Sequence, residues 1–327
     1  MKLKVFVTRK IPKEGIDILK KTCEVKVNPY DRVLTKDELI KEVKKIDGLL
    51  CLLTDTIDKE ILDEALNLKI ISNYAVGYNN ISIEEATKRK IMVTNTPGVL
   101  TDTTADLTWA LLMGIARRIV EADKFTREGK FKGWAPMLFL GFDVHHATLG
   151  IVGFGRIGKA VAKRAKGFDM KILYNDVEKA PEEVEKELGA EFVSLKKLLS
   201  TSDFVSIHTP LSPETYHLIG EKELRMMKKT SFLINVARGP IVDEKALVRA
   251  LKENQIAGAA LDVYENEPHL TPGLSELPNV IVVPHIGSAS IATRTKMATI
   301  AATNLVTGLS GKIPPNLVNK KVLVHSQ

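Results

Sequence analysis

The sequence predicts an α/β protein made of two doubly wound parallel-sheet domains. Strand and helix patterns alternate from the first residues onward, which is typical of parallel strands joined by helical crossovers. A glycine-rich turn of the kind that joins a strand to a helix lies near the middle of the chain. The length of 327 residues exceeds what one ordinary core organises, so two domains are expected.

The first hundred residues hold the pattern of a complete parallel α/β unit. Two of its helices begin at predicted capping boxes, Thr35 with Glu38 and Ser82 with Glu85. Pro97 and Gly98 then interrupt the alternation. The expected strands are 5–8, 25–27, 48–53, 69–75 and 91–94, and the expected helices are 14–21, 34–45, 59–65 and 82–90.

The glycine-rich turn has the layout of a dinucleotide site. An expected strand at 149–152 leads into Gly153-x-Gly155-x-x-Gly158, and a helix pattern at 157–168 follows. Gly153 permits the tight turn, Gly155 leaves the backbone open to a pyrophosphate, and Gly158 lets helix and strand pack closely. The N-terminus of the helix, with Arg156 and Ile157, offers unpaired N–H groups to the phosphates. The sequence therefore predicts a Rossmann-like domain, although a glycine-rich turn alone can be a packing corner.

A second expected strand, 171–176, ends at an acidic residue. Asp176 follows Gly158 by 18 residues, which is the position where a carboxylate accepts hydrogen bonds from the adenosine ribose hydroxyls. The same charge would repel a 2′-phosphate. We therefore expect NAD (NADH) rather than NADP as the cofactor.

The remaining patterns set the expected domain boundaries. We assign 99–288 to the NAD-binding domain, and 1–98 with 289–327 to a discontinuous substrate-binding domain, with the active site in the cleft between them. The terminal helix is expected to cross back to the first domain. The further expected helices are 101–118, 244–254 and 291–309, and the further strands are 204–209, 231–236, 257–263 and 280–283.

Composition narrows the functional classes. The chain is 44% apolar and 27% charged, and no apolar run approaches the roughly 20 residues of a membrane span. Its N-terminus has a strand pattern without the layout of a signal peptide, so we expect a cytoplasmic protein. The net charge of +7 is scattered over helical surfaces without interleaved aromatic residues, which argues against nucleic acid. Cys23 and Cys51 are expected to be buried free thiols rather than a disulfide or metal site.

Three strand ends in the second half supply an arginine, a carboxylate and a histidine. Because parallel strands end at one edge of a sheet, Arg238, Glu267 and His285 are expected on one rim. Reduction of an oxo acid needs a cation for the carboxylate, which Arg238 provides as a fork, and a proton donor, which suits His285. Glu267 would stabilise the protonated ring. Each residue also has a plainer interpretation, as a surface ion pair, an exposed acid or a turn residue.

The sequence around these residues resembles the D-isomer-specific 2-hydroxyacid dehydrogenase family. The resemblance rests on three phrases, Asn235-Val-Ala-Arg-Gly-Pro-Ile-Val-Asp243, Leu261-Asp-Val-Tyr-Glu-Asn-Glu-Pro268 and Pro284-His-Ile-Gly-Ser288. It covers essentially the whole chain. It implies Arg238 as the substrate clamp, His285 as the acid/base and Glu267 as its partner. It further implies that Asp262 contacts the nicotinamide carboxamide and that Thr104, Pro210 and Val236 lie beside the cofactor.

Further motifs resemble the glyoxylate and hydroxypyruvate reductases (D-glycerate dehydrogenases) within this family. Cys51-Leu-Leu-Thr-Asp55 and Asn73-Tyr-Ala-Val-Gly-Tyr-Asn79 carry this likeness, which implies that the N–H groups of Val76 and Gly77 bind the substrate carboxylate. The expected reactions are NADH-dependent reduction of glyoxylate to glycolate and of hydroxypyruvate to D-glycerate. A phosphoglycerate or D-lactate dehydrogenase remains the alternative among enzymes, and a non-catalytic, NAD-sensing scaffold like the corepressors of this family remains the alternative outside them.

The segment 125–142 is rich in Phe, Trp, Met and Leu but has no clear periodicity. It is expected to be either a loop folded back on the core or an arm that packs on a second subunit. Gly133-Trp-Ala-Pro136 resembles the tryptophan loop of these reductases, which implies a homodimer in which Trp134 reaches the partner's substrate pocket. We therefore favour the arm.

Overall fold

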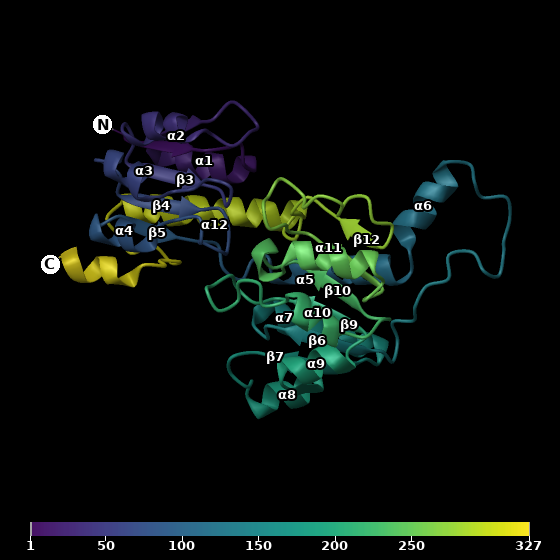
Figure 1. Ribbon diagram of the computed structural model, residues 1–327. Coiled ribbons are helices and arrows are strands. Elements are labelled where there is room, and N and C mark those ends of the chain that lie inside the picture. The colour runs from purple at the N-terminus through teal and green to yellow at the C-terminus, as the bar shows by residue number, and fades with distance from the viewer. Residues whose placement is uncertain (1, 327) are drawn as a thin grey trace. The chain divides into compact units, whose positions relative to one another are not determined.

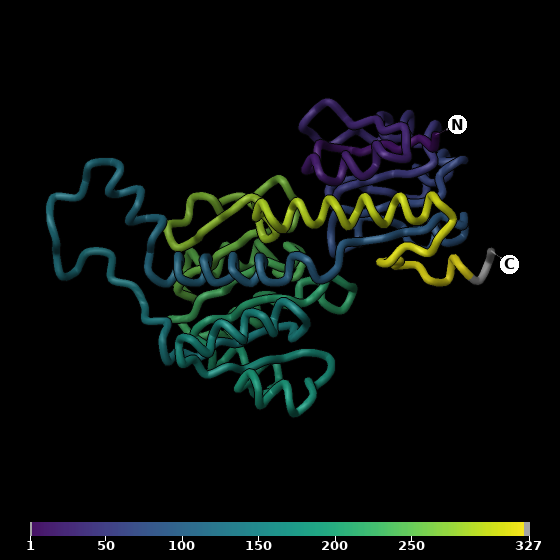
Figure 2. The backbone as a smooth tube through the Cα atoms, turned by 180° about the vertical axis from the view of Figure 1, so that it is seen from behind, coloured from purple at the N-terminus to yellow at the C-terminus, as the bar shows by residue number. Residues whose placement is uncertain are grey.

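The computed structural model describes residues 2–326 and divides into two units, each built on one all-parallel sheet (Figures 1 and 2). Unit 1 comprises the chain up to Leu100 and the chain from Ser288 onward, and unit 2 comprises Thr101–Gly287. Both predicted parallel-sheet domains are confirmed.

Unit 1 has a five-stranded sheet in the order β2-β1-β3-β4-β5. The central strands β3 and β4 are wholly buried, and alternate side chains of the sheet enter two apolar layers. Helices α2, α3 and α4 cover one face, while α1 and α12 cover the other. The bounds are β1 (Leu3–Val7), α1 (Lys13–Thr22), β2 (Cys23–Val27), α2 (Lys36–Val43), β3 (Gly48–Cys51), α3 (Lys59–Glu64), β4 (Ile70–Asn73), α4 (Ile83–Lys88), β5 (Met92–Thr94), α12 (Ile291–Leu309) and η3 (Lys320–Ser326).

The C-terminal helix α12 is an integral part of unit 1. Its side chains share a core with β1, β4 and α1. Gly15 of α1 allows the two helices to approach closely, because a Cβ atom there would lie 2.7 Å from the carbonyl oxygen of Ala298. Although α12 lies far from the strands of unit 1 in the sequence, it covers one face of their sheet.

One of the two predicted capping boxes is confirmed and the other is wrong. Thr35 and Glu38 form the reciprocal pair at the start of α2. Ser82 makes no side-chain cap at α4, and its own N–H donates to the Ile57 carbonyl at 2.9 Å. The Glu85 carboxylate bonds instead to Lys88 at 2.7 Å and to Arg89 at 2.6 Å. Those two cations compete successfully for the carboxylate that would have reached back to the backbone.

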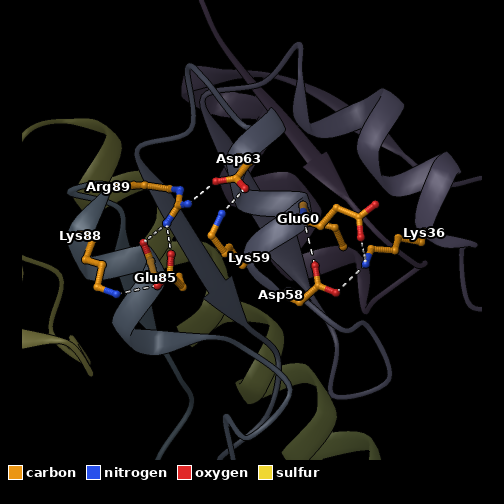
Figure 3. Close-up of polar contacts among 9 residues, drawn as sticks. Lys36, Asp58, Lys59, Glu60, Asp63, Glu85, Lys88 and Arg89 are labelled. Atoms are coloured by element: carbon orange, nitrogen blue, oxygen red, sulfur yellow. Dashed lines mark hydrogen bonds and ion pairs between the residues drawn. The ribbon is translucent and has the colours of Figure 1, made fainter.

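Figure 3 shows two ion-pair sets on this face of unit 1, one of which contains Glu85. Arg89 also pairs with Asp63 of α3, which pairs in turn with Lys59, and Lys36 of α2 pairs with Asp58 and Glu60. Single exposed pairs contribute little at 25 °C, but the desolvation cost of a linked set falls as temperature rises. One set thus links α2 to the start of α3, and the other links α3 to the end of α4.

Unit 2 has a seven-stranded sheet in the order β12-β11-β10-β9-β6-β7-β8. Helices α5 and α7 pack on one face, and α9, α10 and α11 pack on the other. The strand order reverses between β6 and β9, which is where open parallel sheets bind ligands. The bounds are α5 (Thr101–Ala116), α6 (Ile119–Arg127), β6 (Thr148–Val152), α7 (Arg156–Ala165), η1 (Lys166–Phe168), β7 (Lys171–Asn175), α8 (Glu182–Leu188), β8 (Ala190–Phe192), α9 (Leu195–Thr201), β9 (Phe204–Ile207), α10 (Glu221–Met226), β10 (Phe232–Asn235), η2 (Gly239–Ile241), α11 (Glu244–Lys252), β11 (Gly258–Leu261) and β12 (Val280–Val282).

The predicted helix 101–118 ends earlier than expected, and an unpredicted helix follows it. Arg118 has a left-handed backbone with φ of 55°, which turns the chain from α5 into α6. Figure 1 shows α6 and the chain after it extending away from the sheet of unit 2. We call residues 119–142 the arm. The C-terminal end of the arm is anchored by Phe142, whose N–H donates to the Ala116 carbonyl at 2.9 Å.

Two further predictions concern the two cysteines and the expectation that no helix spans a membrane. Cys23 and Cys51 are both buried free thiols, as predicted. Within residues 2–326, no helix combines the length and apolar composition that a membrane span needs.

Candidate active site

The glycine-rich turn connects β6 to α7 and is shaped by close backbone contacts. A Cβ atom at Gly158 would lie 2.3 Å from the carbonyl oxygen of Gly153, so only glycine allows the helix to sit this near the strand. Gly153 has φ of 92° and lies directly against His208 and Thr209, which follow β9. This contact places Pro210 in the segment beside the turn.

The same turn fits a dinucleotide phosphate. A Cβ atom at Gly155 would meet no protein atom within 4 Å, so packing does not explain why this position is glycine. Gly155 is also the N-cap of α7 and has no side chain to cap it. The first N–H groups of the helix, at Arg156 and Ile157, are therefore open to an external anion.

Asp176 lies immediately after β7 and faces the glycine-rich turn. Its Oδ2 atom accepts the N–H of Phe154 at 2.6 Å, and its Oδ1 atom accepts the N–H of Val177 at 2.7 Å. A carboxylate has acceptor positions beyond these two. Asp176 therefore holds the turn in place and can still receive hydroxyl donors.

Asp262 at the end of β11 holds the loop that carries His285. Its two carboxylate oxygens accept the N–H groups of Ile286 at 2.6 Å and Gly287 at 2.8 Å, and its carbonyl accepts the N–H of His285 at 3.0 Å. Burial raises the pKa of the Asp262 carboxyl, while the two backbone donors oppose that rise. Thr104 of α5 lies next to Gly287, so the structure brings Thr104 and Asp262 together.

His285 and Glu267 form a direct pair. The Nδ1 atom of His285 lies 3.0 Å from Oε2 of Glu267, and both side chains are about a quarter to a third exposed. Burial raises the pKa of the Glu267 carboxyl, but the hydrogen bond and charge of His285, the N–H of Tyr264 and the charge of Arg238 together lower it overall. His285 has φ of 52°, a strained conformation that the contacts of Asp262 sustain.

Arg238 follows β10 in a turn that Asn235 shapes. The Asn235 side chain accepts the N–H of Ala237 and donates to the carbonyl of Arg238, both at 3.0 Å, and the same turn fixes the buried Val236. Burial lowers the pKa of the Arg238 guanidinium and the charge of Glu267 raises it. Arginine stays protonated in proteins, so Arg238 is a cation within the field of Glu267.

Three residues make hydrogen bonds near the candidate site that were not predicted from the sequence. Asn235 appears in the family phrase without a role, and its effect depends on a turn that only the structure shows. Tyr264 donates its N–H to Glu267 at 3.1 Å and its hydroxyl to the Val283 carbonyl at 2.8 Å, which links the ends of β11 and β12. His208 bonds through Nε2 to Ser206 at 2.8 Å, while its buried Nδ1 has no partner within residues 2–326.

The remaining predicted residues belong to unit 1 or to the arm. Val76 and Gly77 follow β4 in unit 1, at the carboxyl end of its sheet. Trp134 lies in the arm with 85% of its surface exposed, so within this chain it is not part of the cluster around His285. The alternative of a loop folded back on the core is therefore wrong for this tryptophan, and the arm that the sequence analysis favoured stays a prediction.

The site in unit 2 combines a phosphate-binding turn with a histidine–carboxylate pair and an arginine. Together with the sheet order, this set is typical of a nicotinamide-dependent dehydrogenase in which a protein side chain donates the proton. Comparison with known proteins identifies the family. Residues 109–287 match the D-isomer specific 2-hydroxyacid dehydrogenase, NAD binding domain. The chain belongs to this enzyme family, as the sequence motifs predicted.

Full-length relatives agree with the domain match. A protein of Thermococcus litoralis named glyoxylate reductase is 55% identical over 330 residues, which covers 100% of this chain and 99% of the relative. A crystal structure from Thermus thermophilus superposes with a TM-score of 0.90 at 46% identity, covering 97% of this chain and 100% of that one. An NADPH-dependent glyoxylate/hydroxypyruvate reductase from Sinorhizobium meliloti, solved with NADP and malonate, gives 0.86 at 30% identity, covering 98% of each chain.

Proposed function

We propose that this protein reduces glyoxylate to glycolate and hydroxypyruvate to D-glycerate, with NADH preferred over NADPH. The observation that carries the proposal is the 3.0 Å pair of His285 and Glu267 with the Arg238 cation in the same electrostatic environment. The names of the relatives support glyoxylate as the substrate. The name of the Sinorhizobium meliloti structure supports hydroxypyruvate as a second one.

The residues divide the chemistry among them. Arg238 binds the carboxylate of the 2-oxo acid through two parallel N–H donors, and the N–H groups of Val76 and Gly77 bind the same carboxylate. The bound nicotinamide supplies the hydride that reaches the carbonyl carbon. His285, protonated on its ring, gives its proton to the carbonyl oxygen and becomes neutral, so the product is a 2-hydroxy acid. Glu267 stabilises the protonated ring before transfer and keeps it oriented afterwards.

The cofactor preference rests on Asp176. Its carboxylate borders the glycine-rich turn, where it would accept from the free ribose hydroxyls of NADH and repel the 2′-phosphate of NADPH. The Sinorhizobium meliloti relative is NADPH-dependent, so the preference proposed for this chain has to be measured with both cofactors. The cofactor site would be formed by Gly153, Gly155, Arg156, Ile157, Gly158, Asp176, Thr104, Pro210, Val236 and Asp262.

We further propose that the working form is a homodimer joined through the arm. The exposed apolar side chains of the arm support this, since they would otherwise face water. The cytoplasmic location expected from the sequence stays a prediction.

The decisive experiment measures turnover of the purified chain with NADH and NADPH against glyoxylate, hydroxypyruvate, 3-phosphohydroxypyruvate and pyruvate. Wild type is expected to favour the first two acids with NADH. The His285→Ala variant should lose about 10²-fold to 10⁴-fold in turnover while keeping its NADH affinity. His145→Ala, which changes an exposed histidine outside the cluster, is the matched control.

Each other outcome has a defined meaning. Preference for 3-phosphohydroxypyruvate or pyruvate would assign the chain to phosphoglycerate or D-lactate oxidation instead. Binding of NADH without turnover of any 2-oxo acid would favour the non-catalytic scaffold. Near-normal turnover in His285→Ala would remove this residue from the mechanism.

A further inference from the structure

Three consecutive carbonyl groups after β4 are tied back to unit 1. The Ala75 carbonyl accepts the N–H of Thr96 at 2.9 Å. The Val76 carbonyl accepts from Nδ2 of Asn95 at 2.7 Å, and the Gly77 carbonyl accepts from Nδ2 of Asn73 at 2.8 Å.

These bonds fix the direction of the N–H groups in the same loop. The peptide bonds here are trans, and a planar trans peptide points its C=O and the following N–H in opposite directions. Holding the Ala75 and Val76 carbonyls therefore aims the N–H groups of Val76 and Gly77 the other way. Neither N–H has an acceptor within the part of the chain that the structure describes. Two adjacent, aligned donors without acceptors suit an anion.

We propose that Asn95 and Asn73 are positioning residues that hold the Val76–Gly77 donors in line with the substrate carboxylate. This inference rests on the proposed function, because it takes a 2-oxo acid as the ligand. Neither asparagine touches the substrate in this role. Asn95 acts through the peptide unit that joins Val76 to Gly77, and Asn73 anchors the next peptide unit, which follows Gly77.

Among the described residues, the side chain of Asn95 is seen to bond only to this loop. The backbone of Asn95 is held separately, because its N–H donates to the Asn316 carbonyl at 3.3 Å and its carbonyl accepts from the Asn304 amide at 3.0 Å. Removing the Asn95 side chain therefore leaves β5 and the chain after it anchored. The substitution removes the hydrogen bond to the Val76 carbonyl, so the direction of the Gly77 N–H is no longer fixed.

Asn73 connects the loop to its neighbour. This side chain is fully buried, and its Nδ2 atom also donates to Oδ1 of Asn80 at 3.1 Å. Asn80 in turn donates to the carbonyls of Leu52 and Asp55, which follow β3. The loops after β3 and β4 are thus held as one piece, and Asn73 anchors the carbonyl of Gly77, the second residue of the donor pair.

The experiment compares Asn95→Ala with wild type in steady-state reduction of glyoxylate and of its neutral methyl ester. The KM for glyoxylate is expected to rise about tenfold, because a misaligned hydrogen bond to a charged group forfeits most of its energy. The kcat should change less than threefold, since binding of ground and transition states is weakened alike. The KM for the ester should change much less, because the ester carries no charge for the donors to meet.

The matched control is Asn319→Ala. Asn319 is also a buried asparagine of unit 1, and its amide donates to the Ile91 carbonyl at 2.9 Å and to Thr87 at 3.0 Å, away from the Val76 loop. Asn319→Ala should lower thermal stability without changing the KM for glyoxylate. Asn73→Ala provides a second variant, with the same direction of change expected, should Asn95→Ala fail to fold.

Each result is informative. An unchanged KM in Asn95→Ala, an equal rise for the ester, or an equal rise in Asn319→Ala would overturn the positioning role while the proposed reaction stands. Absence of turnover by wild type on every 2-oxo acid would overturn the reaction, and the positioning role with it. A selective rise in the KM for glyoxylate in Asn95→Ala, with NADH affinity intact, supports both.

Discussion

The Nδ1 atom of His285 lies 3.0 Å from Oε2 of Glu267, and the other oxygen of that carboxylate accepts the N–H of Tyr264 at 3.1 Å. One carboxylate is thereby fixed by the backbone on one side and orients the imidazole ring on the other. Because the pKa of Glu267 is lowered, the carboxylate is charged at neutral pH and stabilises the protonated ring.

The first prediction is a shift in the pH profile of Glu267→Gln. Reduction needs a protonated ring, and the variant lacks the charge that favours it. The kcat/KM for glyoxylate reduction should therefore begin to fall at a lower pH than in wild type, while oxidation of glycolate should extend to lower pH. The measurement is kcat/KM between pH 5 and 10 in both directions.

Glu265→Gln is the control for that profile. Glu265 lies two residues away and pairs with His217 at 3.0 Å rather than with His285. The Glu265→Gln substitution should not change the pH at which kcat/KM for glyoxylate reduction begins to fall. Superimposable profiles for Glu267→Gln and wild type would show that the pair is not coupled in catalysis.

The second prediction concerns cofactor choice and Asp176. Asp176→Ala should weaken NADH binding about tenfold or more, because it removes an acceptor for the ribose and also frees the N–H of Phe154 in the glycine-rich turn. NADPH should be affected less, so the ratio of kcat/KM values for the two cofactors should move toward one. Glu178→Ala removes the same charge from an exposed position two residues on and should leave that ratio unchanged. A wild type that prefers NADPH would refute the assignment of this residue.

The features that the sequence predicted well are those encoded within a few residues. The turn from Gly153 to Gly158 is dictated by backbone contacts that admit no side chain, so its pattern is visible without the structure. His285 and Glu267 follow strand ends of one parallel sheet, and the topology brings strand ends to a common edge.

The features that the sequence did not predict depend on competition or on distant partners. Glu85 fits a capping box by spacing, yet Lys88 and Arg89 take its carboxylate. The helices α8, α9 and α10 have only six or seven residues and were not predicted, although α3 and α4, with six residues each, were. Asn95 acts on Val76 across 19 residues, and no local pattern signals such a contact.

The third prediction is that His208 makes the cofactor-free protein acid-sensitive. Burial lowers the pKa of His208 to about 3 from 6.5, so between these values the unfolded chain binds a proton that the folded chain refuses. Stability is therefore retained above pH 6.5 and lost as the pH falls, by up to about 2 kcal/mol at pH 5. His208→Gln should lose less stability between pH 7 and pH 5 than wild type, as measured by the thermal unfolding of each. Equal losses in the two proteins would show that other groups cause the acid sensitivity.

The arm gives rise to the last prediction. Trp134 and Met137 are 85% and 76% exposed, and Phe131 and Leu140 are more than half exposed, although such side chains normally avoid water. The base of the arm is firmly attached, because Phe142 packs edge-on against Phe232 with ring centroids 5.3 Å apart. A fixed base with an apolar, extended tip is the geometry of a segment that packs on a second subunit.

We therefore expect a homodimer in solution, with the Trp134 ring forming one wall of the partner's substrate pocket and limiting substrates to two or three carbons. Trp134→Ala should keep its NADH affinity, discriminate less between hydroxypyruvate and larger acids, and accept bulkier 2-oxo acids such as 2-oxoisocaproate. Leu66→Ala removes another highly exposed apolar side chain, which belongs to unit 1. This control variant should keep the oligomeric state and the substrate profile of wild type. Light scattering at micromolar concentration tests the dimer, and a panel of 2-oxo acids of increasing size tests the wall. A monomer, or a Trp134→Ala enzyme with the substrate profile of wild type, would refute this role of the arm.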